Sequence, residues 1–119
     1  MNLAWCSDIH LDHVDDNDDA RLIAFAKTVA SNNVDGVLIT GDISNSRRLV
    51  YHLSVLEREL QRPIFFVLGN HDFYGGSIET VRAEMHKLTN LSQFIKYIPL
   101  TSYQALSPRT ALVGHDGWY

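Results

Sequence analysis

The chain has little of three things that would mark other protein classes. Its 119 residues include one cysteine, Cys6, so no intramolecular disulfide can form, and the place of Cys6 in an apolar run predicts a packed core thiol. No apolar run approaches the roughly 18 residues of a membrane span. The 10 Lys and Arg residues are outnumbered by 14 Asp and Glu, and the net charge of −4 gives no support for a nucleic-acid groove. Because the first predicted strand begins almost at Met1, we expect no signal peptide and a cytoplasmic protein.

Three short apolar runs rich in Val, Ile, Phe and Leu predict strands at residues 3–7, 37–40 and 64–68. They are continuous rather than alternating, which is typical of parallel strands covered on both faces. Between them, helical spacing of apolar residues predicts helices at residues 20–30, after an acidic cluster at 15–19, and at 49–60, ended by Pro63. Ser44, Asn45 and Ser46 are candidate caps for the second helix. The order is β-α-β-α-β with right-handed crossovers.

The second part of the chain has a different pattern. A third helix is predicted to begin after Ser77, which would cap it, and to end near Asn90. Short strand-like pieces follow at residues 94–98, 102–106 and 110–114, and their spacing favours an antiparallel meander. We therefore expect one α/β domain over residues 1–119. Because this length is small for a doubly wound enzyme, we also expect the domain to be incomplete.

A polar motif follows each of the three predicted strands: Asp8-Ile9-His10, Gly41-Asp42 and Gly69-Asn70-His71-Asp72. In an open α/β sheet the ligand crevice lies outside the carboxyl ends of the strands, so these motifs should converge there. Carboxylates, imidazoles and a carboxamide oxygen suit a divalent cation. The sequence therefore predicts a metal-dependent hydrolase.

The first two motifs are weak when taken alone. Asp8 could cap a turn with His10 half exposed, and Asp42 could form an Asx-turn or a helix cap. The third motif is more specific, because an amide, an imidazole and a carboxylate directly after a buried run are hard to explain as a solvated loop. Asn70 can offer its carbonyl oxygen to a metal, and Asp72 can orient His71 or support its charged form.

These residues resemble the calcineurin-like metallophosphoesterase superfamily, whose pattern runs D-x-H, G-D-x-x-[DN] and G-N-H-[DE] before further histidines that include G-H-x-H. Residues 8–10, 41–45 and 69–72 match the first three motifs. The resemblance implies a fold that starts with β-α-β-α-β and packs a second sheet against the first, with helices outside (an α/β/β/α sandwich). Asn45 stands where many relatives carry Asp or Asn.

The resemblance also implies roles for individual residues. Asp8 and His10 would bind one cation, Asp42 would bridge two, and Asn70 would bind the second. His71 would contact the substrate phosphate and donate a proton to the leaving oxygen, with Asp72 as its partner. The expected cofactors are two divalent ions, of manganese, iron or zinc, and the expected substrates are small-molecule phosphate esters or phosphoproteins.

The remaining histidines depart from the family pattern. No G-H-x-H motif is present, and His115 in Gly114-His115-Asp116-Gly117 is better explained by a tight turn than by a broken copy of it. His13, beside Asp12, could lie next to the site but is better explained as a surface loop residue. His52 and His86 are expected to face solvent from their helices.

The missing late histidines lead us to expect the N-terminal part of a longer phosphoesterase. Such a part alone would bind metal weakly, would hydrolyse phosphate esters slowly if at all, and could pair with itself through an unfinished sheet edge. Two alternatives stay open at this point. One is a non-catalytic binding or scaffolding module with the same fold, and the other is a nuclease of the same superfamily. Phe73 and Tyr74 could line the substrate pocket or pack in the core.

Overall fold

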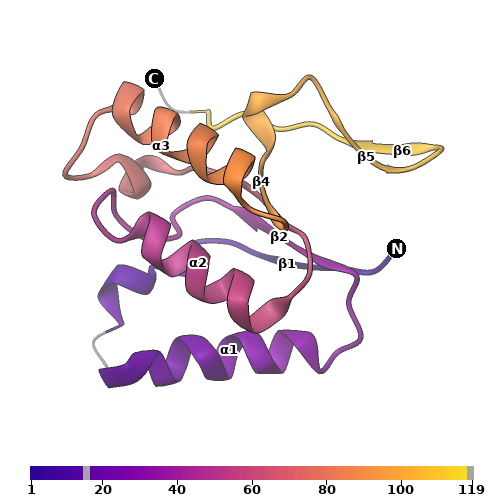
Figure 1. Ribbon diagram of the computed structural model, residues 1–119, viewed down its shortest axis with the longest axis horizontal. Coiled ribbons are helices and arrows are strands. Elements are labelled where there is room, and N and C mark those ends of the chain that lie inside the picture. Colours follow the sequence, from indigo (N-terminus) through magenta and orange to yellow (C-terminus); the bar gives the residue numbers. More distant parts are fainter. Residues whose placement is uncertain (15–16, 118–119) are drawn as a thin grey trace.

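The structure, a computed structural model, describes residues 1–14 and 17–117 (Figure 1). Asp15 and Asp16 of the acidic cluster lie outside the described residues. The strands are β1 Leu3–Cys6, β2 Gly36–Thr40, β3 Ile64–Val67, β4 Ile95–Tyr97, β5 Gln104–Ser107 and β6 Thr110–Leu112. The helices are α1 Ala20–Ala30, α2 Leu49–Leu60 and α3 Ile78–Leu91, with short 3₁₀ helices at Leu11–His13, Asn17–Asp19, Asn70–Phe73 and Ile98–Leu100.

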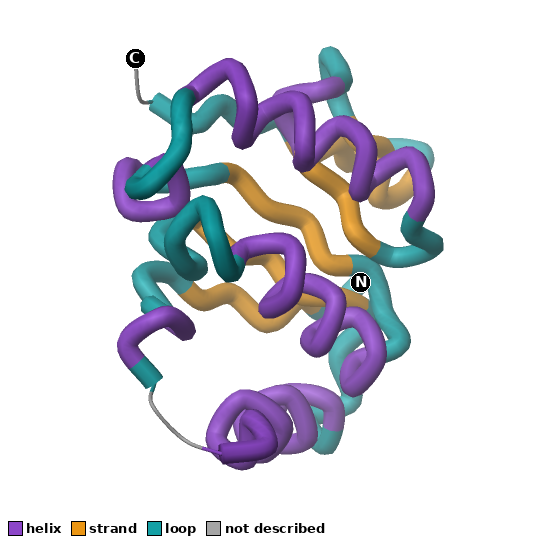
Figure 2. The backbone as a smooth tube through the Cα atoms, turned by 60° about the vertical axis from the view of Figure 1, so that its left-hand side comes forward, coloured by secondary structure: helices purple, strands orange, loops and turns teal. Residues whose placement is uncertain are grey.

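Four parallel strands form the central sheet in the order β1-β2-β3-β4, and β5 and β6 form a separate antiparallel pair. Each helix connects one strand to its next neighbour, so every crossover steps in the same direction along the sheet. Right-handed crossovers that step in one direction place their helices on the same face. Figure 2 shows the three helices together in front of the strands. The predicted α/β class and its β-α-β-α-β start are confirmed.

Local signals predicted the helices well. The bounds of α1 and α2 agree with the prediction, and α3 ends one residue later than expected, at Leu91. Ser77 caps α3 as predicted, because its hydroxyl accepts a hydrogen bond from the Thr80 amide at 3.0 Å. Asn45 organises the turn before α2, where its side-chain oxygen accepts from the amides of Arg47 and Arg48, both at 3.1 Å.

The predicted antiparallel meander is wrong in its first member. Residues 95–97 form β4, which pairs parallel to β3 with Ile64 opposite Ile95 and Phe66 opposite Tyr97. Ile95 and Tyr97 are buried, so this strand belongs to the main core. The helix α3 supplies the long crossover that a parallel pairing requires. Only the last two pieces pair antiparallel, as β5 and β6.

The expectation that both faces of the parallel strands are covered holds at β3, where Phe65 on the face away from the helices is buried, but it is wrong at β1. Residues on the helix side, such as Ile39 and Phe66, are fully buried, but Trp5 on β1 is 73% exposed. Its indole nitrogen donates to the Thr40 hydroxyl at 3.0 Å. Cys6 is half buried against the core, as predicted, and burial raises the pKa of its thiol. Self-pairing through the sheet edge stays a prediction.

None of the helices in the described ranges is long and apolar enough to cross a membrane.

The prediction that His52 faces solvent from α2 is wrong. The residue is 3% exposed and its Nδ1 is hydrogen-bonded to the Ser44 hydroxyl at 2.7 Å, so it joins α2 to the loop after β2. Burial lowers the pKa of the imidazole, and the nearby Arg48 guanidinium lowers it further. The folded state therefore prefers the neutral ring. His86 on α3 is exposed, as predicted.

The buried His52 should make stability depend on pH. Because its pKa is lower in the folded than in the unfolded chain, its contribution is present above the ordinary value of 6.5 and is lost as the pH falls below it. In urea unfolding of the metal-free chain this loss should appear as a difference from a variant without the titrating ring, because the Asp72 carboxyl, whose pKa burial raises to about 6, changes the stability of both proteins in the opposite direction. The His52→Gln variant, which keeps a hydrogen-bonding amide without a titrating ring, should lose less over the same range. Equal losses in both proteins would contradict this assignment.

Candidate metal centre

The polar motifs lie beyond the carboxyl ends of β1, β2 and β3, and backbone hydrogen bonds join the first two of these loops. The Asp8 amide donates to the Gly41 carbonyl and the His10 amide to the Asp42 carbonyl, both at 3.0 Å. These bonds continue the pairing of β1 and β2 after the strands have ended. The predicted convergence of the first two motifs is therefore built into the backbone.

Three of the predicted ligands share an uncommon backbone conformation. Asp8, His10 and Asp42 have φ values of 55°, 43° and 53°, in the left-handed region that non-glycine residues rarely occupy. Asp and His tolerate this region better than most side chains, and such residues persist only where the surrounding structure holds them. Their clustering at one edge of the sheet is the pattern expected of a functional site.

Glycine is required where the loops after β2 and β3 meet. A Cβ added to Gly69 would lie 2.1 Å from Asp42 Oδ1 and 2.6 Å from the Asp42 amide nitrogen. A Cβ on Gly41, at φ 99°, would lie 2.9 Å from the Gly69 amide nitrogen. The two glycines let the loops approach, and this brings the third motif to the first two.

The donor set fits a divalent cation. One ligand atom from each of Asp8, His10 and Asp42 can be chosen so that all lie within 4.8 Å of one another, and His10 Nε2 is 3.7 Å from Asp42 Oδ2. Metal–ligand bonds of about 2.0–2.2 Å place neighbouring ligands about 3–4 Å apart, so small side-chain movements suffice. Mixed oxygen and nitrogen donors suit manganese, iron or zinc.

The third motif brings Asn70 and His71 to the same place. The His71 amide donates to Asp42 Oδ1 at 3.1 Å, and the His71 ring lies 4.8 Å from that of His10 between centroids. Tyr74 packs its ring 4.5 Å from the His71 ring, and its hydroxyl accepts from the Asn70 amide nitrogen at 3.1 Å. Because this hydrogen bond uses the side-chain nitrogen of Asn70, the side-chain oxygen stays available as a metal ligand. Phe73 is buried in the core, so of the two aromatic residues only Tyr74 borders the site.

Asp72 is fully buried beneath the site and holds the loops together. Its Oδ1 accepts from the amides of Ile43 at 2.9 Å and Ser44 at 2.8 Å, and its Oδ2 accepts from the Gly69 amide at 2.9 Å. Burial raises the pKa of this carboxyl to about 6, although the three amides oppose the shift. These contacts give Asp72 a positioning role; a direct effect on the His71 ring stays a prediction.

Sequence reasoning missed two residues near the site. Asp116, expected only in a turn, is buried, and its carboxylate accepts from the Leu68 amide at 2.8 Å, from Arg82 Nε at 3.2 Å and from the Tyr97 hydroxyl. It therefore fixes the residue that precedes Gly69. His115 is exposed, and its Nδ1 accepts from the Gly117 amide at 2.9 Å, which agrees with the predicted turn.

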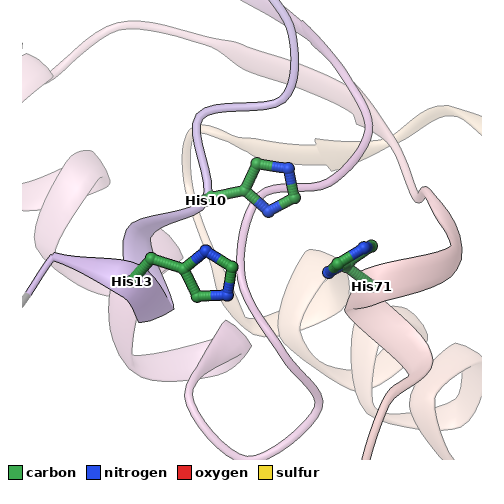
Figure 3. A group of neighbouring side chains, drawn as sticks. All are labelled: His10, His13 and His71. Atoms are coloured by element: carbon green, nitrogen blue, oxygen red, sulfur yellow. The ribbon is translucent and has the colours of Figure 1, made fainter.

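His13 is the second residue that was missed. Its side chain is 65% exposed, as a surface position predicts, but its ring stacks on that of His10 at 5.2 Å and lies 6.3 Å from that of His71 (Figure 3). The spacing of His10 and His13 in sequence was the one available signal. The spacing alone does not show that the two rings lie together; the 3₁₀ helix Leu11–His13 places both rings on the same side.

Comparison with known families agrees with this geometry. The family model of the calcineurin-like phosphoesterases matches residues 1–118, so the chain belongs to that family. No curated protein matches the chain. Membership in a hydrolase family that generally uses divalent metal ions is consistent with the Asp and His groups found at the sheet edge.

The backbone of Gly69 lies so close to Asp42 that a side chain at this position has no room. Gly69→Ala should lower the free energy of unfolding by about 1–3 kcal/mol, because the new methyl group overlaps Asp42. It should also weaken Mn²⁺ binding measured by calorimetry. Gly76→Ala is the control, because there the nearest atoms, the Ser46 Cβ and Oγ, lie 3.0 Å from the added Cβ, a much smaller overlap than at Gly69 and one that does not involve Asp42. A Gly69→Ala protein as stable as the parent, with unchanged Mn²⁺ affinity, would show that the loops need no such approach.

Proposed function

We propose that the protein is a metal-dependent phosphoesterase with a dinuclear centre at the carboxyl edge of the parallel sheet. One observation carries the proposal: Asp42 lies within ligand distance of Asp8 and His10 and also accepts the His71 amide. A single carboxylate thus joins the candidate cation ligands to the candidate acid. Asp8 and His10 would hold one cation, Asp42 would be shared between two, and Asn70 would hold the second.

The ions would supply positive charge and a water of lowered pKa for in-line displacement at phosphorus. The chain supplies the positions. Asp42 sets the distance between the two sides of the centre, and its Oδ1 holds the backbone of His71. Asp72 keeps the loops after β2 and β3 at a fixed separation through three amide bonds.

His71 is the candidate acid for the leaving oxygen. Its backbone is anchored on Asp42, and its ring is bordered by His10 on one side and by Tyr74 on the other. A ring restrained in this way can present one nitrogen to a bound phosphate ester. The substrate class we propose is a small-molecule phosphate ester or a phosphoprotein. The net charge of −4 argues against a nucleic-acid substrate.

The single cysteine is consistent with the predicted cytoplasmic location, which we retain as part of the proposal.

Hydrolysis of an aryl phosphate by the chain, with Mn²⁺ added after removal of bound metal, tests the proposal. We expect turnover that is slow but requires Mn²⁺. Asp42→Asn should abolish it, since the bridging charge is lost, and His71→Gln should lower it about 10²- to 10⁴-fold, the usual contribution of a general acid. Asp42→Asn can still accept the His71 amide, so its loss of activity would reflect chemistry rather than unfolding.

His86→Gln is the matched control, because His86 is exposed on α3, where its Nδ1 is hydrogen-bonded to Asn90 Nδ2 at 3.2 Å. It should retain full activity. Turnover that is identical in the wild type and Asp42→Asn would exclude the dinuclear phosphoesterase. Normal Mn²⁺ binding with no turnover at all would favour the non-catalytic binding module.

A further inference from the structure

Three histidine rings, those of His10, His13 and His71, lie close together at the candidate metal centre (Figure 3). His10 follows β1, His13 ends the 3₁₀ helix Leu11–His13, and His71 lies in the 3₁₀ helix Asn70–Phe73. One nitrogen from each ring can be chosen so that all three lie within 4.8 Å of one another. This group contains no carboxylate, and it shares only His10 with the Asp8, His10 and Asp42 group.

An unsatisfied atom marks the region between the groups. His10 Nδ1 is buried and has no hydrogen-bond partner within the described part of the chain, whereas Nε2 of the same ring faces Asp42 at 3.7 Å. The two nitrogens of an imidazole point away from each other, so one ion cannot take both. A buried polar atom without a partner is costly, and a cation bound at Nδ1 would remove that cost.

Asp12 provides a second, independent observation. Its side chain is 10% exposed, its Oδ2 lies 3.4 Å from His13 Nε2, and its Oδ1 is buried without a partner among residues 1–14 and 17–117. Histidines that bind metals commonly donate their other ring nitrogen to a carboxylate, which fixes the ring orientation. The contact with Asp12 therefore makes Nδ1 of His13 the atom available to a cation.

We propose that His10, His13 and His71 form a three-imidazole site for a borderline transition-metal ion such as Zn²⁺, as an alternative to the carboxylate-containing centre, because a neutral His10 ring offers a lone pair at only one of its two nitrogens. Three nitrogen donors with a fourth, open position give the tetrahedral arrangement that Zn²⁺ adopts. Ions that prefer oxygen, such as Mn²⁺ and Mg²⁺, should favour the carboxylate-containing group instead.

The shared use of His71 gives the site a regulatory consequence that rests on the proposed function. A ring nitrogen that binds a cation cannot carry the proton needed by the leaving group. Excess Zn²⁺ should therefore inhibit the Mn²⁺-loaded protein through His13. The binding site itself does not depend on the phosphoesterase assignment, so it is tested by binding.

Titration of the metal-free chain with Co²⁺, a spectroscopic substitute for Zn²⁺, tests the site. In the Asp42→Asn background, which removes the bridging carboxylate, we expect one Co²⁺ to bind with the intense visible absorption of a four-coordinate ion. His13→Gln in that background should weaken binding by at least about tenfold. His86→Gln, the matched control on α3, should leave it unchanged. Co²⁺ binding that is lost in Asp42→Asn, or that is unaffected by His13→Gln, would overturn the proposal.

A second measurement keeps Asp42 in place, so its result does not depend on whether the Asp42→Asn variant folds. His13 is 65% exposed, so its replacement removes little packing. Nitrogen hyperfine structure in the electron paramagnetic resonance spectrum of one bound Cu²⁺ should show one fewer nitrogen in His13→Gln than in the wild type or in His86→Gln. The same nitrogen count in all three proteins would rule His13 out as a ligand. Failure of the phosphoesterase proposal alone would leave these spectra as expected.

Discussion

The site depends on the contact between the loops after β2 and β3, where the backbone of Gly69 lies against Asp42 with no room for a side chain. Two carboxylates secure this contact from opposite sides. Asp42 accepts the His71 amide of the second loop, and Asp72 of the second loop accepts amides of the first. Each loop therefore satisfies backbone groups of the other. If the contact opened, the candidate cation ligands and the candidate acid would separate together.

This arrangement contains strain and a buried charge, and both are offset locally. Asp8, His10 and Asp42 occupy the left-handed region, which costs on the order of 1–3 kcal/mol for each such residue. The backbone hydrogen bonds between the first two loops hold them there. The Asp72 carboxyl is removed from water, which raises its pKa to about 6, but its three amide donors compensate for much of the lost solvation.

The scaffold supports the site from one side of the sheet. The three helices cover one face, and α2 is tied to the loop after β2 by the buried Ser44–His52 hydrogen bond. On the far side of the third motif, Asp116 connects α3, β4 and the end of β3 through Arg82, Tyr97 and the Leu68 amide. The loop after β2 is thus held by α2, and the loop after β3 is held through Asp116 to α3 and β4. A site on a rigid edge of this kind can keep the close spacing that two cations require.

The sequence alone determined the features that depend on neighbours along the chain. Apolar periodicity and capping residues such as Ser77 predicted the helices, and the polar motifs after three apolar runs predicted which residues meet at the sheet edge. The pairing of β4, the burial of His52 and the roles of His13 and Asp116 were decided only by tertiary structure. The physical reason is that these features depend on partners distant in sequence or on the direction in which a short turn orients a side chain. Such dependence leaves no periodic or local signal in the sequence.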